Sequence, residues 1–178
     1  SDFEIIDSNP RYIQQLDKIE NVRQILRYEQ FKNCFRELDV SYITGETGAG
    51  KTRSVMEKYG YQNVYRVTDY DHPFDSYKGQ DVIVFEEFRS SLKIQDMLNY
   101  LDGYPCELPC RYNNKLACFT KVYIITNIPF NQQYINIQAE SKETWKAFCR
   151  RIHHFFTCTK ALGMQEETEW VQMTCFEK

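Results

Sequence analysis

The chain has 178 residues, of which 42% are hydrophobic, a content that accommodates one sizeable core and a small appendage but not two large domains. Its formal net charge of -3 excludes a protein that coats nucleic acid over its whole surface, although a local basic patch or a pore formed by oligomerisation remains open. No apolar run has the length of a membrane span and no charged-then-apolar leader opens the sequence, so we expect a soluble protein with no membrane partner.

The N-terminal part of the chain has a helical pattern. Residues 1–9 are polar, and a capping residue before Pro10 predicts a helix start there. From Arg11 to Leu38, apolar residues recur every three or four positions, which predicts two or three helices with breaks near Asn21 and Asn33. Helices packed on their own domain and a bundle that contacts another subunit explain this pattern equally well.

The strongest motif follows at residues 45–52, which match the phosphate-binding P-loop pattern G-x-x-x-x-G-K-[ST]. A predicted strand at residues 40–44 and a predicted helix at residues 53–59 supply the setting that the pattern requires. Backbone N–H groups and the helix N-terminus would bind phosphates of ATP, Lys51 would reach the terminal phosphates, and the Thr52 hydroxyl would hold Mg²⁺. The predicted nucleotide-binding residues are Gly45, Glu46, Thr47, Gly48, Ala49, Gly50, Lys51 and Thr52.

Two acids form the second landmark. After a predicted strand at residues 63–67 and a loop at 68–79, the apolar run within residues 81–87 predicts a central parallel strand buried on both faces. Glu86 and Glu87 end this strand, where open α/β sheets bind ligands. P-loop ATPases use one carboxylate here for the Mg²⁺ shell and a second one to activate water. We therefore expect Glu86 on the metal side and Glu87 as the base.

The next elements are a helix at residues 91–101, a hairpin at residues 107–119 and another doubly buried strand at residues 121–127. The hairpin has an Asn-rich tip with Lys115 beside it. It is either an ordinary hairpin or one that touches a phosphate backbone. Asn127 would sit beside the γ-phosphate if its strand lies between the P-loop strand and the Glu86 strand.

The C-terminal part begins with a helix from about Ser141 that ends at Arg150 and Arg151. A fifth strand is expected at residues 153–158. Its adjacent histidines would point to opposite faces, so we do not expect a shared metal. Residues 165–169 are acidic, and with the apolar residues after them they suggest a loosely attached edge segment.

In this order, the P-loop, paired acids, hairpin, Asn-tipped strand and paired arginines resemble the helicase domain of Rep proteins. These are the replication initiators of circoviruses, related small circular single-stranded DNA viruses and rolling-circle plasmids, and their helicase domains are classed as superfamily 3. The resemblance covers residues 40–158 and implies an AAA+-like α/β fold, a five-stranded mainly parallel sheet between helices. It further implies a helical oligomerisation domain at residues 1–38, an ATPase domain at 39–160 and a tail at 161–178.

The resemblance also implies roles for particular residues. Lys51 and Thr52 correspond to Walker A, Glu86 and Glu87 to Walker B, and Asn127 to the sensor motif. Either Arg150 or Arg151 corresponds to the arginine finger that reaches a neighbour's nucleotide in a ring, expected to be a hexamer. The residues expected to contact single-stranded DNA in the pore of that ring are Arg111, Asn114 and Lys115.

The chain departs from the family pattern at two places. Members of that family commonly have Asp-Asp at Walker B, whereas this chain has Glu86-Glu87, whose longer reach would alter metal geometry. The nicking domain of whole Rep proteins has a metal-binding His pair, and no such pattern occurs before residue 40. An ATP-binding scaffold without helicase activity and a small-molecule kinase are the alternatives, the kinase being disfavoured by the second carboxylate.

The seven cysteines are an odd number and are typical of free thiols in a reducing compartment. We expect an intracellular protein, placed in the host nucleus if it is viral and in the cytoplasm if it comes from a bacterial plasmid.

Overall fold

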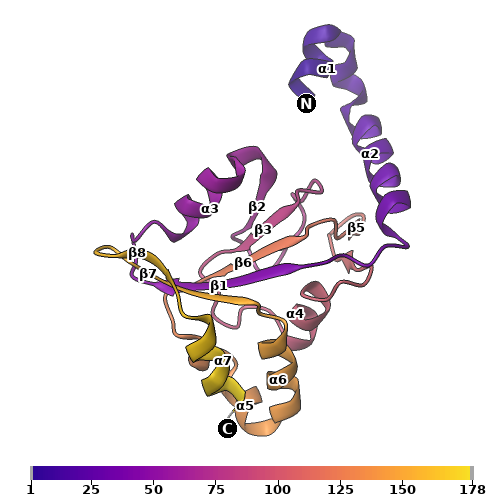
Figure 1. Ribbon diagram of the computed structural model, residues 1–178. Coiled ribbons are helices and arrows are strands. Elements are labelled where there is room, and N and C mark those ends of the chain that lie inside the picture. Colours follow the sequence, from indigo (N-terminus) through magenta and orange to yellow (C-terminus); the bar gives the residue numbers. More distant parts are fainter. Residues whose placement is uncertain (1, 177–178) are drawn as a thin grey trace.

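The computed structural model describes residues 2–176 and shows a central sheet with helices on both faces (Figure 1). The sheet has the strand order β2-β3-β6-β1-β7-β8, in which β8 alone is antiparallel to its neighbour. Its strands are β1 (Asp39–Gly45), β2 (Val64–Val67), β3 (Val82–Phe85), β6 (Lys121–Ile125), β7 (His154–Thr159) and β8 (Gly163–Glu166). The predicted α/β class with a mainly parallel sheet is confirmed.

The sheet has six strands rather than the predicted five. The additional strand is β8, which folds back on β7 so that Gly163 pairs with Thr159 and Glu166 pairs with Phe156. All four of its residues are exposed, so the strand has no apolar pattern that could have revealed it. Part of the predicted tail thus forms the edge of the main sheet, and residues 177–178 of that tail lie outside the described residues.

The centre of the sheet is buried on both faces, as the apolar runs predicted. Every residue of β3 is buried, as are four of the five residues of β6. β6 lies between β1 and β3, which is the arrangement that the placement of Asn127 required.

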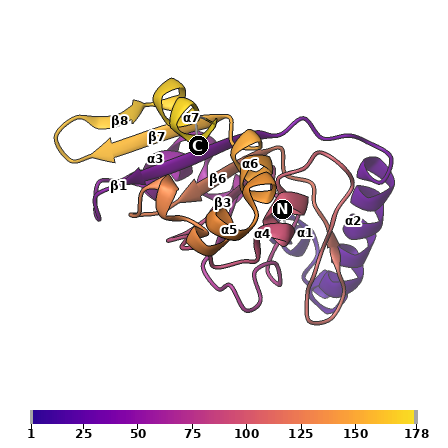
Figure 2. The ribbon, with the colours of Figure 1, turned by 90° about the horizontal axis from the view of Figure 1, so that it is seen from below.

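The helices divide into two layers around this sheet (Figures 1 and 2). Helix α3 covers one face, where Val55 and Met56 join a cluster with Ile43 and Ile125. The larger core lies on the other face, beneath helices that the chain reaches after β3. The helices are α3 (Lys51–Tyr59) on the first face, and α4 (Ile94–Tyr100), α5 (Ile135–Glu140), α6 (Lys142–Arg150) and α7 (Thr168–Phe176) on the second. Short 3-10 helices are η2 (Tyr61–Asn63) and η3 (Phe130–Gln132).

The N-terminal helices project from this body (Figure 1). They are α1 (Asp2–Ser8), the 3-10 helix η1 (Pro10–Gln15) and α2 (Leu16–Phe31). The predicted start at Pro10 is confirmed, since the Asn9 side chain accepts a hydrogen bond from the Arg11 N–H at 3.1 Å. The helix ends just before Asn33 as predicted, but the predicted break near Asn21 is wrong. Glu20 beside it bonds to Gln24 one turn later, which stabilises a continuous helix.

Arg36 anchors the connection between these helices and the sheet. Its side chain is 3% exposed and donates from Nη1 to the Phe119 carbonyl at 2.8 Å and from Nη2 to the Asp102 carbonyl at 3.0 Å. Burial lowers the pKa of this guanidinium. The hydrogen bonds of the buried Arg36 guanidinium to backbone carbonyls therefore fix the direction in which the segment between α2 and β1 runs.

The predicted hairpin is present but has only short ladders, β4 (Glu107–Leu108) and β5 (Lys115–Leu116). The intervening loop is held by side chains instead, because Asn114 accepts from the Cys110 N–H at 3.3 Å and donates to Glu107 at 3.3 Å. The cysteines whose side chains are described are all free, and Cys118, Cys149 and Cys158 are buried.

Candidate nucleotide-binding site

The P-loop connects β1 to α3 at the C-terminal edge of the sheet. A Cβ on Gly45 would lie 1.9 Å from the Cys158 carbonyl oxygen, so the loop can leave the sheet on this path only with glycine. Gly50, directly before α3, has a left-handed φ of 87°. The glycines of the pattern therefore have conformational reasons to be there, as expected for a loop that wraps an anion.

Lys51 points into the loop that precedes it. Its side chain is buried, and Nζ donates to the carbonyl oxygens of Gly45 and Glu46, both at 2.8 Å. Both contacts are to neutral acceptors, which an anionic phosphate oxygen would outcompete. The ammonium is thus held at the P-loop without a neutralising carboxylate among its described hydrogen bonds.

Thr52 and Glu86 meet although 34 residues separate them. The Thr52 hydroxyl donates to Glu86 Oε2 at 2.8 Å. The pair joins the first turn of α3 to the residue directly after β3, which are the two places that the sequence pattern assigned to Mg²⁺. A hydroxyl and a carboxylate oxygen at one point are hard ligands that suit Mg²⁺, with phosphate and water oxygens to complete its shell. Among residues 2–176, no cluster of three or more His, Cys, Asp or Glu side chains could hold a metal by itself.

The two adjacent acids lie in different environments. Glu86 is 8% exposed, and its Oε1 accepts from Arg66 Nε at 2.7 Å. Glu87 is exposed and has a φ of 46°, a conformation uncommon outside glycine, which turns it away from the strand direction. Tyr70 donates to the Glu86 carbonyl at 2.7 Å, and burial, with the two carboxylates nearby, raises the pKa of its hydroxyl so that it stays a donor.

Asn127 lies at the same edge, two residues after the end of β6. Its Oδ1 accepts from Arg89 Nη2 at 2.9 Å. Arg89 comes two residues after Glu87, so this contact ties the loop after the acid pair to the loop after β6. The P-loop, the acids and Asn127 are therefore brought to neighbouring strand ends, as predicted from their order in the sheet.

A buried amide holds the loop that carries Glu87 and Arg89. Gln133 is fully buried, and its Oε1 accepts from the Ser90 N–H at 2.7 Å and from the Ser90 hydroxyl at 2.9 Å. Its Nε2 donates to the Phe88 carbonyl at 2.9 Å and to the Tyr42 hydroxyl at 3.0 Å. Ser90 has a φ of 54°, so two residues of this short loop have left-handed backbones that Gln133 helps to hold.

Three cations near the site were not identified from the sequence. Arg66 contacts Glu86, Arg89 contacts Asn127, and Lys160 lies beside the P-loop, where its Nζ is 4.0 Å from the position of a Cβ on Gly48. Arg66 and Lys160 have no local motif, because their nearness depends on pairing of β2 with β3 and on the turn after β7. Of the three, only Arg89 could have been identified from the sequence, because it follows shortly after the paired acids.

The structure places the paired arginines at the opposite edge of the sheet. They precede β7, whose first residue, His154, pairs with Ser41 near the start of β1, while Cys158 pairs with Gly45. Four residues of strand, about 13 Å, separate these edges. Arg151 donates to Asp102 Oδ2 at 2.7 Å, whereas the Arg150 side chain is exposed and has no hydrogen bond or ion pair among the described residues.

The hairpin residues form a separate surface. Lys115 Nζ donates to the Asp75 carbonyl at 2.7 Å, and Arg111 forms an ion pair with the Asp75 carboxylate. The Arg111 N–H and guanidinium bonds hold the pKa of Asp75 below its ordinary value of 3.8. Tyr112, which the sequence analysis did not single out, is 91% exposed at the tip.

These features match the fold that the superfamily 3 resemblance implies: a mainly parallel sheet, a P-loop after β1, acids after β3 and an amide after the strand between them. The family model described as RNA helicase matches residues 41–127, which include these motifs.

Curated relatives are replication proteins. A replication-associated protein of canary circovirus is 28% identical over 89 residues, which cover 50% of this chain and 30% of the relative. One of goose circovirus is 32% identical over 90 residues, covering 50% and 29%. A replication protein of Onion yellows phytoplasma (strain OY-M) is 30% identical over 108 residues, covering 57% and 28%. The chain therefore matches less than a third of the length of each relative, and these similarities confirm the resemblance to the superfamily 3 domain of Rep proteins.

Within residues 2–176, no helix is long and apolar enough to cross a membrane.

Proposed function

We propose that the chain is the ATP-hydrolysing helicase domain of a rolling-circle replication initiator, acting on single-stranded DNA. The observation that carries this proposal is the contact between Thr52 and Glu86, which joins the P-loop to the acidic strand end. A phosphate-binding loop alone would serve many purposes. A hydroxyl and a buried carboxylate placed together beside it are what ATP hydrolysis with Mg²⁺ needs.

Each residue has a defined task in this proposal. The P-loop N–H groups bind the phosphates of ATP, and Lys51 exchanges its two carbonyl acceptors for phosphate oxygens. Thr52 and Glu86 hold Mg²⁺, which supplies neutralisation of phosphate charge. Glu87, exposed and turned out of the strand, takes a proton from the attacking water. Asn127, oriented by Arg89, positions the γ-phosphate.

The paired arginines act in trans in this proposal. Since they lie at the sheet edge away from the P-loop of their own chain, a role at a nucleotide requires a neighbouring subunit. Arg151 is already engaged by Asp102, and we therefore assign the finger to Arg150. An arginine at this place would stabilise charge that develops in the transition state.

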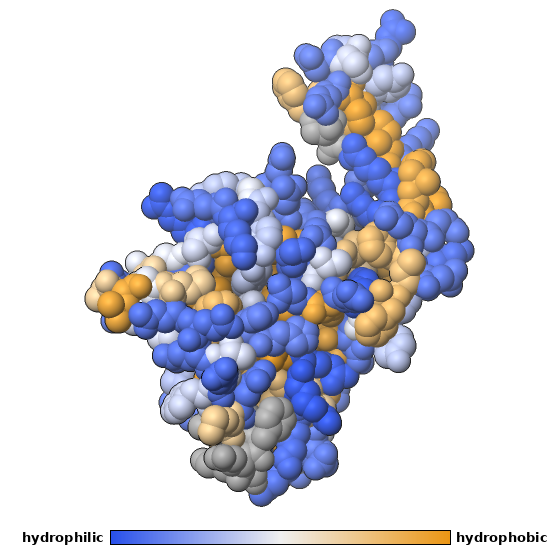
Figure 3. All heavy atoms as spheres, viewed as in Figure 1, coloured by the Kyte–Doolittle hydropathy of each residue, from blue (hydrophilic) through white to orange (hydrophobic). Residues whose placement is uncertain are grey.

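The exposed apolar surface of the N-terminal helices supports an oligomer, which we propose to be a hexameric ring. Figure 3 shows hydrophobic side chains along α2, where a solitary helix would carry polar ones. Val22, Ile25 and Leu26 are each more than half exposed. The large apolar side chains exposed on this part of the chain are Phe3, Tyr12, Ile13, Val22, Ile25, Leu26 and Tyr28.

The hairpin is the proposed contact to DNA. Arg111, Asn114 and Lys115 would exchange their present partners for phosphates of a single strand, with Tyr112 beside them. Contacts to phosphates are insensitive to base sequence and weaken with salt.

The test is Glu87→Gln, with Glu140→Gln as the control because Glu140 is an exposed acid on α5 away from the P-loop. Glu87→Gln should bind ATP but hydrolyse it at least about 100-fold more slowly, the contribution of a general base. Glu140→Gln should match the wild-type chain. Hydrolysis by Glu87→Gln at the native rate would remove the base assignment.

A nucleotide-gated scaffold is the second candidate, favoured by the Arg66 ion pair that occupies the Glu86 carboxylate. The two candidates differ in one result. A motor hydrolyses ATP faster when single-stranded DNA is added to the oligomer, whereas a scaffold shows no stimulation.

A further inference from the structure

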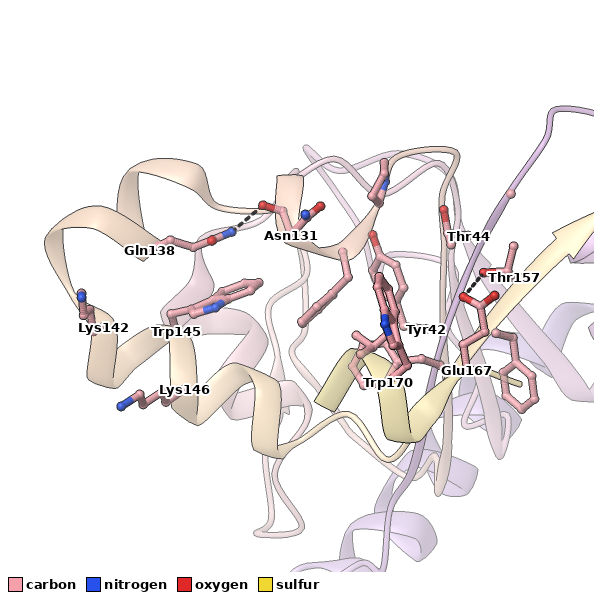
Figure 4. A pocket seen from close by; sticks show the side chains of 16 residues that line it. Tyr42, Thr44, Asn131, Gln138, Lys142, Trp145, Lys146, Thr157, Glu167 and Trp170 are labelled. Carbon is pink, nitrogen blue, oxygen red and sulfur yellow. Dashed lines mark hydrogen bonds between the residues drawn. The ribbon is translucent and has the colours of Figure 1, made fainter. Parts of the chain in front are cut away.

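A large cavity lies on the face of the sheet opposite α3, between β1, β7, α6 and α7 (Figure 4). Its volume is about 920 Å³, within the range of small-molecule sites. Four aromatic side chains from the core form its inner wall, and Trp170 of α7 lies at its outer side with 68% exposure. The buried aromatic residues are Tyr42, Phe130, Trp145 and Phe155.

The rim of this cavity near the C-terminal edge of the sheet is polar. Thr44 and Thr157 pair across β1 and β7, so their side chains lie next to each other on the cavity face. Thr157 Oγ1 donates to Glu167 Oε2 at 2.8 Å, which brings a carboxylate to the same rim. The cavity thus has an aromatic interior and an oxygen-rich mouth, and the mouth lies toward the edge that carries the P-loop.

The cavity and the P-loop share a wall. Gly45 lines the cavity and is also the first residue of the P-loop, and Thr44 lies directly before it. If the phosphates of a nucleotide occupy residues 45–52, its base can lie no farther from this edge of the sheet than the length of one nucleoside. An aromatic cavity that opens beside the phosphate loop supplies the apolar surface that a base requires.

We propose that this aromatic cavity binds the base and ribose of the nucleotide whose phosphates occupy the P-loop. The inference rests on the proposed function. The base stacks on the aromatic side chains, Trp170 covers it from the outside, and the ribose hydroxyls donate to Glu167 as they do to the acidic residue of dinucleotide sites. The ligand class is therefore a ribonucleoside phosphate rather than a bare polyphosphate.

A strand of DNA fits this cavity less well. Glu167 lines it on the α7 side, and its carboxylate would repel a polyanion more than a ribose. Lys142 and Lys146 contribute cations only on the α6 side. Deoxyribose also lacks one of the hydroxyls that would bond to Glu167.

The chain has two tryptophans, Trp145 and Trp170, and both line this cavity, so its tryptophan fluorescence is a direct reporter. ATP should change this fluorescence at saturation, whereas inorganic tripolyphosphate, which competes for the P-loop, should not. Trp170→Phe should retain the response to ATP through Trp145. An equal response to both ligands would show that the fluorescence reports phosphate binding alone and would overturn the proposal.

Calorimetry provides the second measurement, the ratio of the tripolyphosphate Kd to the ATP Kd. Trp170→Ala should lower this ratio about tenfold, the value of one stacking contact, and Trp170→Phe should restore most of it. Glu167→Gln should lower it as well. Glu169→Gln is the matched control, since Glu169 lies two residues after Glu167 in the first turn of α7 but does not line the cavity, and it should leave the ratio unchanged.

The outcomes separate this inference from the proposed function. Lys51→Ala should weaken both ligands and leave the ratio near the wild-type value. If both ligands bind to the wild-type chain but the cavity variants leave the ratio unaltered, the P-loop assignment stands and the cavity proposal is refuted. If neither ligand binds, both are refuted. Oligo(dT) that changes the fluorescence when ATP does not would assign the cavity to DNA bases and overturn the proposal.

Discussion

Replacing Gln133 by leucine tests the loop that carries Glu87. The substitution removes four hydrogen bonds, but the loss is not uniform. The Tyr42 hydroxyl still donates to the Ile128 carbonyl, and the Ser90 hydroxyl still accepts from the Tyr134 N–H. The groups left without these partners are the Ser90 N–H and the Phe88 carbonyl. Each such group costs about 1–3 kcal/mol, so the free energy of unfolding should fall by about 3 kcal/mol.

The measurement is urea unfolding followed by circular dichroism, with Gln132→Leu as the control. Gln132 is the neighbouring residue but is exposed, so its variant should stay within about 0.5 kcal/mol of the wild-type chain. Thermal unfolding of Gln133→Leu should show a midpoint lower by about 6–12 °C. A loss below about 0.5 kcal/mol for Gln133→Leu would refute the reasoning, because it would mean that the loop holds its left-handed residues without the amide.

The same variant has an expected effect on hydrolysis. Since the loop presents Glu87 and Arg89, and Lys51 lies on a different element, kcat should fall while the KM for ATP stays close to the wild-type value. An increase in KM with unchanged kcat would show that Gln133 supports nucleotide binding rather than the position of these residues.

Three further predictions concern charged side chains away from the P-loop. Arg111 lowers the pKa of Asp75 in the folded state, so the contribution of this carboxylate to stability is present above pH 3.8 and is lost as the pH falls through the lower folded-state pKa. In urea titrations at a series of acidic pH values, the difference in the free energy of unfolding between the wild-type chain and Asp75→Asn should therefore shrink below pH 3.8. A difference that stays constant with pH would contradict this. Arg151→Ala should lower the free energy of unfolding by about 1 kcal/mol through loss of its bond to Asp102, whereas Arg150→Ala should leave it unchanged and reduce ATP hydrolysis only in the oligomer. Hydrolysis at the native rate by oligomeric Arg150→Ala would remove the finger assignment.

Much of the fold was predictable from local patterns. The strands β3 and β6 are continuous apolar runs because they are buried on both faces, and the helix after the P-loop has its apolar residues at helical spacing. β8 was not predictable, since its four exposed residues have no alternation and it forms only because β7 offers a free edge. The break expected at Asn21 failed because a single amide residue does not outweigh helix-stabilising contacts on either side of it.

For the candidate site too, local patterns predicted some features and strand order decided the others. The functions proposed for the P-loop and the acids come from residue types at fixed spacing, and the chain alone specifies them. The partners of those residues depend on strand order: Arg66 meets Glu86 because β2 pairs with β3, and Arg151 is engaged by Asp102 from the segment after α4. The sequence left Arg150 and Arg151 equivalent, and only their contacts distinguish them.

What the sequence by itself determined was the presence of a loop with the P-loop pattern, a pair of acids and the class of sheet that carries them, because these depend on glycine conformations and apolar periodicity within short segments. The tertiary structure alone decided which side chains meet at the edge of that sheet and that both tryptophans line one cavity beside the P-loop. Such contacts join residues more than 100 positions apart, as between Thr44 and Thr157, and they follow from strand pairing, which no local pattern encodes.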